Sequence, residues 1–258
     1  MTALKLASLG GGHGLFATLR AGRALGAEIT AIVTVADDGG SSGRLRSELG
    51  IIPPGDLRMA LAALMPDDDR GEFWAGILQH RFGGGGAMAG HPVGNLLLAG
   101  LCEVLGDPVD ALDAIADRFG VQGRVLPMVP GPLRIEADVT GLEDDPRLSR
   151  VIRGQVAVAT TVGQVRRVRL LPGDPPATRQ AVAHVAAVAA RADGTGRERM
   201  LVDSKKVGTG AELSEEEKMQ RERRRHEKEQ TKAQRRDKRA AKGPGVISQL
   251  KQAYAMTK

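Results

Sequence analysis

The stretch LKLASLGGGHGLFATLRAGRAL, residues 4–25, decides the fold of this chain. Leu4 to Leu9 is a short, mostly apolar run with the length of a buried strand, and a loop from Gly10 to Gly14 follows it directly. From Leu15 to Leu25 the apolar residues recur at helical spacing. A strand, a glycine loop and a helix in this order open a βαβ unit, so the sequence predicts a Rossmann-like α/β fold built on a parallel sheet.

A second predicted strand ends in a cluster of polar residues. Ile29 to Val35 is rich in β-branched residues, and ADDGGSSG, residues 36–43, follows it. The two adjacent aspartates of this segment therefore come at the carboxyl end of the strand, where open α/β sheets bind their ligands. We expect Ser41 and Ser42 to cap the amino-terminal end of the next helix.

The middle of the chain is predicted to be unusually helical. Pro54 suits the first turn of a helix, and the apolar residues after it recur at helical spacing. The glycine-rich stretch 82–90 predicts a flexible hinge between two helices. One helix is expected to start near Pro54. Three further helices are expected to cover Glu72–Phe82, His91–Leu105 and Pro108–Phe119.

A small antiparallel β insertion is expected over about residues 124–171. The short alternating runs there include LRIEADV, GQVAVATT and QVRRVRLL, the last with arginines exposed on one face. An alanine-rich helix follows and starts near residues 175–178. We therefore assign residues 1–193 to one Rossmann-like domain that contains the insertion.

The composition excludes several classes of protein. Aromatic residues make up only 2% of the chain, so we do not expect stacking on exposed bases or nucleic acid as a partner. Cys102 is the only cysteine, which rules out an internal disulfide or a thiolate metal site within one chain. No apolar window approaches the roughly 20 residues of a spanning helix, so we expect no membrane span and a cytoplasmic protein.

The last part of the chain, residues 194–258, differs in character. Residues 212–258 hold 14 basic and 8 acidic side chains, whereas residues 1–211 hold 23 of each, so the tail carries the whole net charge of +6. A segment with so few apolar residues predicts a solvated helix or disorder. The alternative is an interaction tail whose runs RERRRHEK and KAQRRDKRAAK bind RNA or anionic lipid.

The glycine loop is the first candidate binding site, formed by Gly10, Gly11, Gly12, His13 and Gly14. The backbone N–H groups of such a loop and the start of the following helix together favour a phosphate group. The spacing does not match the G-x-G-x-x-G fingerprint of dinucleotide-binding proteins. A phosphate site is the favoured interpretation and a simple tight turn is the alternative, while His13 is either a phosphate donor or merely exposed.

Further candidates follow the second strand or begin predicted helices. The aspartates after the strand suit a ribose, a base edge or a hydrated Mg²⁺, and the serines and the arginine suit phosphate oxygens. A turn cap is the alternative role for Asp38, and a helix cap for Asp56 and His91. Arg44 is alternatively a surface residue. These candidates are Asp37, Asp38, Gly39, Gly40, Ser41, Ser42 and Arg44 after the strand, and Asp56, His91, Gly94 and Asn95 at the helix starts.

Several long motifs, taken in order, resemble the YvcK-type gluconeogenesis factor family of bacteria, relatives of the 2-phospho-L-lactate transferases. The resemblance covers about residues 1–193. It is carried by LGGGHGL (9–15), ITAIVTVADDGGSSGRLRSELGIIPPGDLRMALAAL (29–64), GHPVGNLLL (90–98), LRIEADVTGL (133–142) and RGQVAVATT (153–161).

This resemblance implies a Rossmann-like core that binds a nucleotide sugar such as UDP-N-acetylglucosamine. It also implies a regulatory role in carbon-source-dependent cell shape and wall synthesis. For this branch of the family it implies no catalysed reaction. In the transferase relatives, aspartates at the motif positions of Asp37, Asp38 and Asp56 assist phosphoryl-group transfer with Mg²⁺. A Mg²⁺-dependent transferase of a phosphate-linked group is therefore the second hypothesis, with Asp37 and Asp56 as metal ligands.

The chain departs from the family pattern in two places. PPGDLRM has Met59 where the family usually has an asparagine. After the alanine-rich helix the family continues with a strand, a glycine-proline-glycine-serine turn and the second half of its sheet, whereas GTGRERMLVDSKK, residues 194–206, follows here. We therefore expect an incomplete sheet. The expected ligand is a nucleotide sugar, and whether the chain forms a homo-oligomer is left open.

Overall fold

The computed structural model describes residues 4–143, 145, 148–195 and 201–202, which belong to one structural unit within residues 1–205. The predictions made for the charged tail beyond residue 202, including its two basic runs, lie outside the described residues. The first elements along the chain are β1 (Lys5–Gly10), α1 (Gly12–Ala24), β2 (Glu28–Val33), α2 (Gly40–Leu49), α3 (Pro54–Ala63), α4 (Asp69–Gln79), α5 (Val93–Leu105) and α6 (Pro108–Phe119). They are followed by β3 (Arg124–Pro127), β4 (Arg134–Thr140), β5 (Ser149–Arg153), α7 (Gln155–Thr160), β6 (Gln164–Leu171), α8 (Arg179–Thr195) and β7 (Leu201–Val202).

The main sheet is parallel, and its strands lie in the order β3-β2-β1-β7. Gly10 pairs with Val33, and Val33 pairs with Pro127. The three longer strands therefore end at the same level, and the segments that follow β1 and β2 leave the sheet side by side. The predicted Rossmann-like α/β architecture is confirmed.

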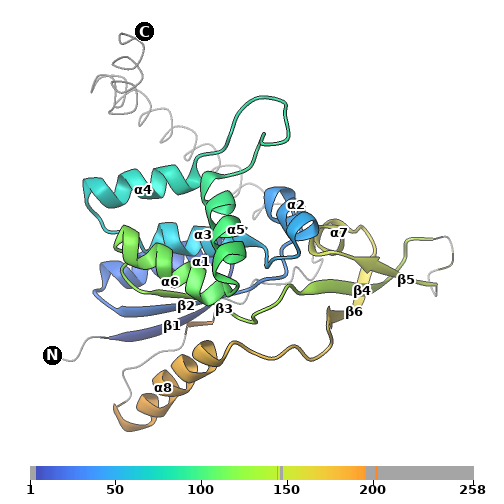
Figure 1. The fold of residues 1–258 in the computed structure, drawn as a ribbon. Coiled ribbons are helices and arrows are strands. Elements are labelled where there is room, and N and C mark those ends of the chain that lie inside the picture. The colour runs from blue at the N-terminus through green and yellow to red at the C-terminus, as the bar shows by residue number, and fades with distance from the viewer. Residues whose placement is uncertain (1–3, 144, 146–147, 196–200, 203–258) are drawn as a thin grey trace, which may run out of the picture. The chain divides into compact units, whose positions relative to one another are not determined.

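Helices cover both faces of this sheet. Helices α1 and α3 lie over one face and α8 lies over the other (Figure 1). The larger core joins α1 and α3 to the sheet through fully buried side chains such as Leu15, Leu19, Leu57 and Leu61. The smaller core, on the α8 side, is built around Ile32 and Leu126 with Ala181. Two apolar faces of the sheet are thus buried, as its run of branched aliphatic residues requires.

The helical middle is confirmed, but three helix starts differ from the prediction. Helix α5 starts at Val93, after the predicted His91. Helix α4 starts at Asp69, before the predicted Glu72, because the side chain of Asp68 caps it by accepting a hydrogen bond of 2.7 Å from the Gly71 N–H. The prediction that Ser41 and Ser42 cap α2 is wrong. That helix starts at Gly40, so both serines lie in its first turn, and their hydroxyls bond to other segments.

The second sheet is antiparallel, as predicted, with strand order β5-β4-β6. Its extent differs from the expected insertion, because Arg124–Pro127 pairs with β2 in the main sheet. The run GQVAVATT, predicted as a strand, instead forms helix α7 over Gln155–Thr160. Its first turn is held by Asp38, whose carboxylate accepts a hydrogen bond of 3.0 Å from the Val156 N–H, and this tertiary contact overrides the local alternation.

Among the described residues, the helices are too short or too polar to cross a membrane.

Candidate functional site

The candidate site lies where β1 and β2 end. The Thr34 N–H donates a hydrogen bond of 2.8 Å to the Gly10 carbonyl, which continues the pairing of the two strands past their last residues. The glycine loop and the ADDGGSSG segment therefore leave neighbouring strands at one edge of the sheet. This is the position at which open α/β sheets bind ligands, and the sequence predicted that both segments lie there.

The glycine loop is shorter than predicted because helix α1 begins inside it. Gly11 is the N-cap residue, with extended backbone and no side-chain cap, so Gly12, His13 and Gly14 form the first helical turn. Gly12 has a φ of +62°, a conformation that favours glycine. As a glycine, Gly11 offers no side-chain cap to the first N–H groups of α1, and the helix dipole adds partial positive charge there. Such an end suits an anion, and the His13 side chain beside it is exposed.

Asp56 lies directly against the glycine loop. A Cβ built on Gly11 would collide with the Asp56 carboxylate and would lie 2.6 Å from Oγ1 of Thr34. Glycine is therefore needed at this position for Asp56, at the start of α3, to approach the loop. Thr34 was not predicted as a site residue, although its position directly after β2, at the ligand edge, was a usable signal.

Asp37 lies beside the same end of α3. Its Oδ1 accepts a hydrogen bond of 3.0 Å from the Gly39 N–H, and its Oδ2 lies 3.4 Å from a Cβ built on Gly55, the residue before Asp56. The Ser42 hydroxyl accepts a hydrogen bond of 3.1 Å from the Gly55 N–H and so joins α2 to α3. The structure thus brings two of the three candidate carboxylates to the start of α3, and one of them, Asp56, lies against the glycine loop.

Asp38 faces a different part of the molecule. Besides its hydrogen bond to the Val156 N–H, its Oδ2 occupies the space that a Cβ on Gly154 would need. A capping role was the alternative for this residue, and the structure supports capping, although of the distant helix α7 rather than of the following turn. Asp38 therefore fixes the β insertion to the ADDGGSSG segment.

A buried polar network lies behind the site and ties α2, α3, α4 and α5 together. The Ser41 hydroxyl lies 2.8 Å from Nδ1 of His91 and accepts a hydrogen bond of 3.0 Å from Nδ2 of Asn95. Oδ1 of Asn95 in turn accepts a hydrogen bond of 2.9 Å from Nε of Arg58, and that guanidinium also donates to Oε1 of Gln79. Ser41, Arg58, His91 and Asn95 are all buried, and their side chains bond to one another behind the site.

Arg58 was not predicted from the sequence. Burial and the nearby charge of Arg81 lower its pKa to about 10, while Asp56 opposes the shift, so the guanidinium stays charged near neutral pH. The signal was a single basic residue on a largely apolar helix, whose other charged residue is Asp56. Burial, and next the charge of Arg44, lower the pKa of His91, so its imidazole is neutral near pH 7.

Gly94 allows the network to pack closely. A Cβ at this position would lie 2.8 Å from Cγ of Arg58 and 2.9 Å from the backbone oxygen of Leu78. Helix α5 can therefore approach α3 and α4 only with glycine here. Gly94 therefore has a packing role in this structure, and its predicted binding role stays a prediction.

Arg44 holds the glycine-rich segment 82–90. Its guanidinium donates hydrogen bonds of 2.9 Å to the Ala89 carbonyl and 3.4 Å to the Ala87 carbonyl. Arg81 donates a further hydrogen bond of 2.8 Å to the Gly90 carbonyl. Arg44 is exposed, so its cationic group remains at the surface beside α2.

The predicted metal ligands suit a cation that arrives with a phosphate. Within the described residues, no group of three or more histidines, cysteines or carboxylates could hold a metal ion. Mg²⁺ is commonly bound by one or two carboxylates, several waters and substrate phosphates. Asp37 and Asp56 supply such a pair at the start of α3, where Asp56 lies against the glycine loop and Asp37 lies beside Gly55.

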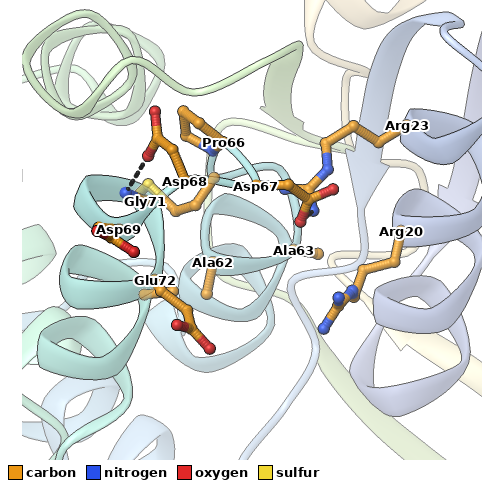
Figure 2. A pocket seen from close by; sticks show the side chains of 12 residues that line it. Arg20, Arg23, Ala62, Ala63, Pro66, Asp67, Asp68, Asp69, Gly71 and Glu72 are labelled. Carbon is orange, nitrogen blue, oxygen red and sulfur yellow. Dashed lines mark hydrogen bonds and ion pairs between the residues drawn. The ribbon is translucent and has the colours of Figure 1, made fainter. Parts of the chain in front are cut away.

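Two cavities lie away from this edge. The larger, of about 320 Å³, is formed by the C-terminal half of α1, the end of α3 and the start of α4 (Figure 2). The other, of about 260 Å³, lies at the opposite ends of the strands, where β2 begins. Neither is lined by a residue that the sequence pointed to.

Comparison with known proteins gives consistent matches. The family model described as 2-phospho-L-lactate transferase CofD matches residues 6–191. A protein of Mycobacterium tuberculosis that bears the gluconeogenesis factor name is 72% identical over 177 residues, which are 69% of this chain and 52% of that protein. The gluconeogenesis factor of Bacillus subtilis is 42% identical over 168 residues, or 65% of this chain and 50% of that protein.

A solved structure also matches. The crystal structure of a UPF0052 family protein from Bacillus halodurans superposes with a TM-score of 0.64 at 36% identity, and the match covers 72% of this chain and 56% of that one. The chain thus spans about half the length of the curated relatives that it matches.

Proposed function

The chain belongs to the CofD family and, within it, to the gluconeogenesis factors, and from this premise we propose that it binds a nucleotide sugar of the UDP-N-acetylglucosamine type. In this proposal it acts as a regulator of carbon-source-dependent cell shape and wall synthesis. The regulatory role is supported by the family resemblance, and the ligand class is supported by the site as well.

The observation that carries the proposal is the glycine-rich start of α1 at the ends of two adjacent parallel strands. The N–H groups of Gly12, His13 and Gly14 suit the oxygens of a diphosphate. Ser42 and Asp37 hold the neighbouring segment against the same end of α3. The sugar and base then extend along the open sheet edge.

Two carboxylates at the start of α3 argue for a cation. The negative charges of Asp37 and Asp56 oppose the approach of a diphosphate, which is itself an anion. A Mg²⁺ ion held by these two residues would supply the positive charge that lets phosphate oxygens and carboxylates lie close together. Binding of the nucleotide sugar is therefore expected to depend on Mg²⁺.

Isothermal titration of the full chain with UDP-N-acetylglucosamine tests the proposal. We expect saturable binding with Mg²⁺ present and a large loss of affinity when the metal is chelated. Asp56→Asn should remove most of the metal dependence, whereas Asp117→Asn, an exposed aspartate on α6, should leave it unchanged. Equal affinity in all conditions, or no binding in any, contradicts the proposal.

A second candidate function is a Mg²⁺-dependent transferase that moves a phosphate-linked group. The placement of Asp37 and Asp56 at the phosphate cradle favours it, as does the description of the matching family. Incubation with nucleotide-activated donors and Mg²⁺ separates the two functions. Product formation supports the transferase, and intact binding without turnover supports the regulator.

A further inference from the structure

The hydrogen bonds of the buried network run in one direction. Nε of Arg58 carries a hydrogen and cannot accept one, so the side-chain oxygen of Asn95 must be its acceptor, over 2.9 Å. The other end of that amide is an NH₂ group, which donates to the Ser41 hydroxyl over 3.0 Å. The guanidinium of Arg58 thus fixes the orientation of Asn95, and Asn95 in turn makes Ser41 an acceptor.

The same reasoning assigns the proton of His91. The Ser41 hydroxyl oxygen lies 2.8 Å from Nδ1 of His91. A hydroxyl has a single hydrogen, and its other neighbour, the amide of Asn95, is a donor, so Nδ1 is its acceptor within the described network. Nδ1 therefore carries no hydrogen, and the neutral imidazole has its proton on Nε2. Ser41 is 7% exposed and His91 is 5% exposed, so solvent is a poor substitute for this contact.

Protonation of His91 reverses the contact between the ring and the hydroxyl. Both ring nitrogens of a charged imidazole are donors. Ser41 then accepts from Asn95 and from His91 at once, and its own hydrogen loses its acceptor inside the protein, which is costly. Neutral His91 and charged His91 therefore require different arrangements around Ser41.

The charges around His91 add to this cost. Burial lowers its pKa most, Arg44 on α2 lowers it further, and Glu48 on the same helix acts in the opposite direction. From α3 the nearest charge of the network is Arg58, which reaches the ring through Asn95 of α5. Segment 82–90, which precedes the ring, holds no charged residue. The neutral form is therefore the stable one near pH 7.

Ser41 couples His91 to the ligand edge of the sheet. Ser41 and Ser42 are neighbours in the first turn of α2. The Ser42 hydroxyl accepts a hydrogen bond of 3.1 Å from the N–H of Gly55, the residue before Asp56, and Asp56 lies against the glycine loop. A change in the hydrogen bonds of Ser41 thus acts on the turn that holds the start of α3.

We propose that His91 is a proton-sensitive switch of the nucleotide-sugar site, in which the neutral ring holds the first turn of α2 in the binding arrangement and the protonated ring releases it. The control of ligand binding rests on the proposed function, whereas the reversal of the Ser41–His91 contact does not. Since the folded protein lowers the pKa of His91, ligand affinity falls as the pH drops below the ordinary value of 6.5.

The ring nitrogens provide the first test. Two-bond ¹H–¹⁵N spectra of the full chain at pH 7.5 should show His91 with a proton on Nε2 and none on Nδ1. The chain has five histidines, and His91→Asn identifies the signal by removing it. Asparagine also supplies a side-chain oxygen that accepts from Ser41 and does not titrate. A proton on Nδ1 at this pH overturns the proposal.

Backbone amides then report the reversal without any ligand. Between pH 7.5 and pH 5, the amide signals of Ser41, Ser42 and Gly55 should shift with the same midpoint as the His91 ring. The shifts should be absent in His91→Asn and unchanged in His80→Asn, which removes an exposed histidine at the end of α4. Amides that stay fixed while the ring titrates, or that shift equally in all three proteins, contradict the switch.

Affinity for UDP-N-acetylglucosamine with Mg²⁺, measured by isothermal titration, tests the control of the site. From pH 7.5 to pH 5.5 it should fall at least about threefold more in the wild type and in His80→Asn than in His91→Asn. An equal fall in all three proteins overturns the control of binding. No binding at any pH overturns the proposed function and this control with it, while the ring and amide signals still decide the reversal by themselves.

Discussion

Replacing Asn95 by alanine is expected to destabilise the protein strongly, because this side chain joins two halves of the buried network. Asn95 is 1% exposed, donates to the Ser41 hydroxyl and accepts from Nε of Arg58. The variant leaves a cationic donor of Arg58 without its acceptor in the protein interior. Loss of a partner to a buried group costs about 1–3 kcal/mol, and more when the group is charged.

The magnitude follows from what remains after the change. Ser41 keeps its contact with His91, and Arg58 keeps its hydrogen bond to Gln79, so the network loses its central link but neither end is isolated. Together with the lost side-chain packing, we expect the free energy of unfolding to fall by about 2–4 kcal/mol.

Equilibrium unfolding in urea measures this change. Glu103→Ala, on the exposed face of the same helix, should alter the free energy of unfolding by no more than about 0.5 kcal/mol. A loss below about 1 kcal/mol for Asn95→Ala would refute the assignment of a structural role to the network.

Three further predictions concern neighbouring groups. Gly94→Ala should lower the free energy of unfolding by about 1–3 kcal/mol, measured by urea unfolding, because the new methyl group meets Arg58 and a backbone oxygen. His91 has a lowered pKa when folded, so the unfolded chain binds its proton more tightly, and stability should fall as the pH drops below the ordinary value of 6.5. Urea midpoints between pH 8 and pH 5 should show a smaller fall in His91→Asn, and parallel curves would contradict this. Asp38→Ala should remove the cap of α7 at a cost of about 1 kcal/mol, visible as faster amide exchange at Val156, and unchanged exchange would show that the cap is dispensable.

The sequence was sufficient for the parts of the fold that depend on local pattern. The glycine loop after the first strand, the aspartates after the second and the helix starting at Pro54 are all where the pattern placed them. Hydrophobic periodicity and the conformational freedom of glycine decide such elements, and neither needs a distant partner.

The errors arose where a distant contact decides the outcome. The segment GQVAVATT alternates like a strand, but Asp38, more than a hundred residues earlier in the chain, caps it as a helix. Only the packing against α2, α3 and α4 shows that His91 and Asn95 are buried and that Gly94 is closely packed, and the binding roles predicted for them stay predictions. A sequence motif identifies the residues that matter without indicating whether they face a ligand or support the residues that do.

The amide signals of Gly11 to Gly14 test the central claim most directly. In ¹H–¹⁵N correlation spectra of the full chain titrated with UDP-N-acetylglucosamine and Mg²⁺, the account predicts that the largest shifts fall on these amides and on those around Asp37 and Asp56, because the phosphates meet the first turn of α1. Saturable shifts that leave Gly11 to Gly14 unchanged and fall elsewhere in the chain would contradict it.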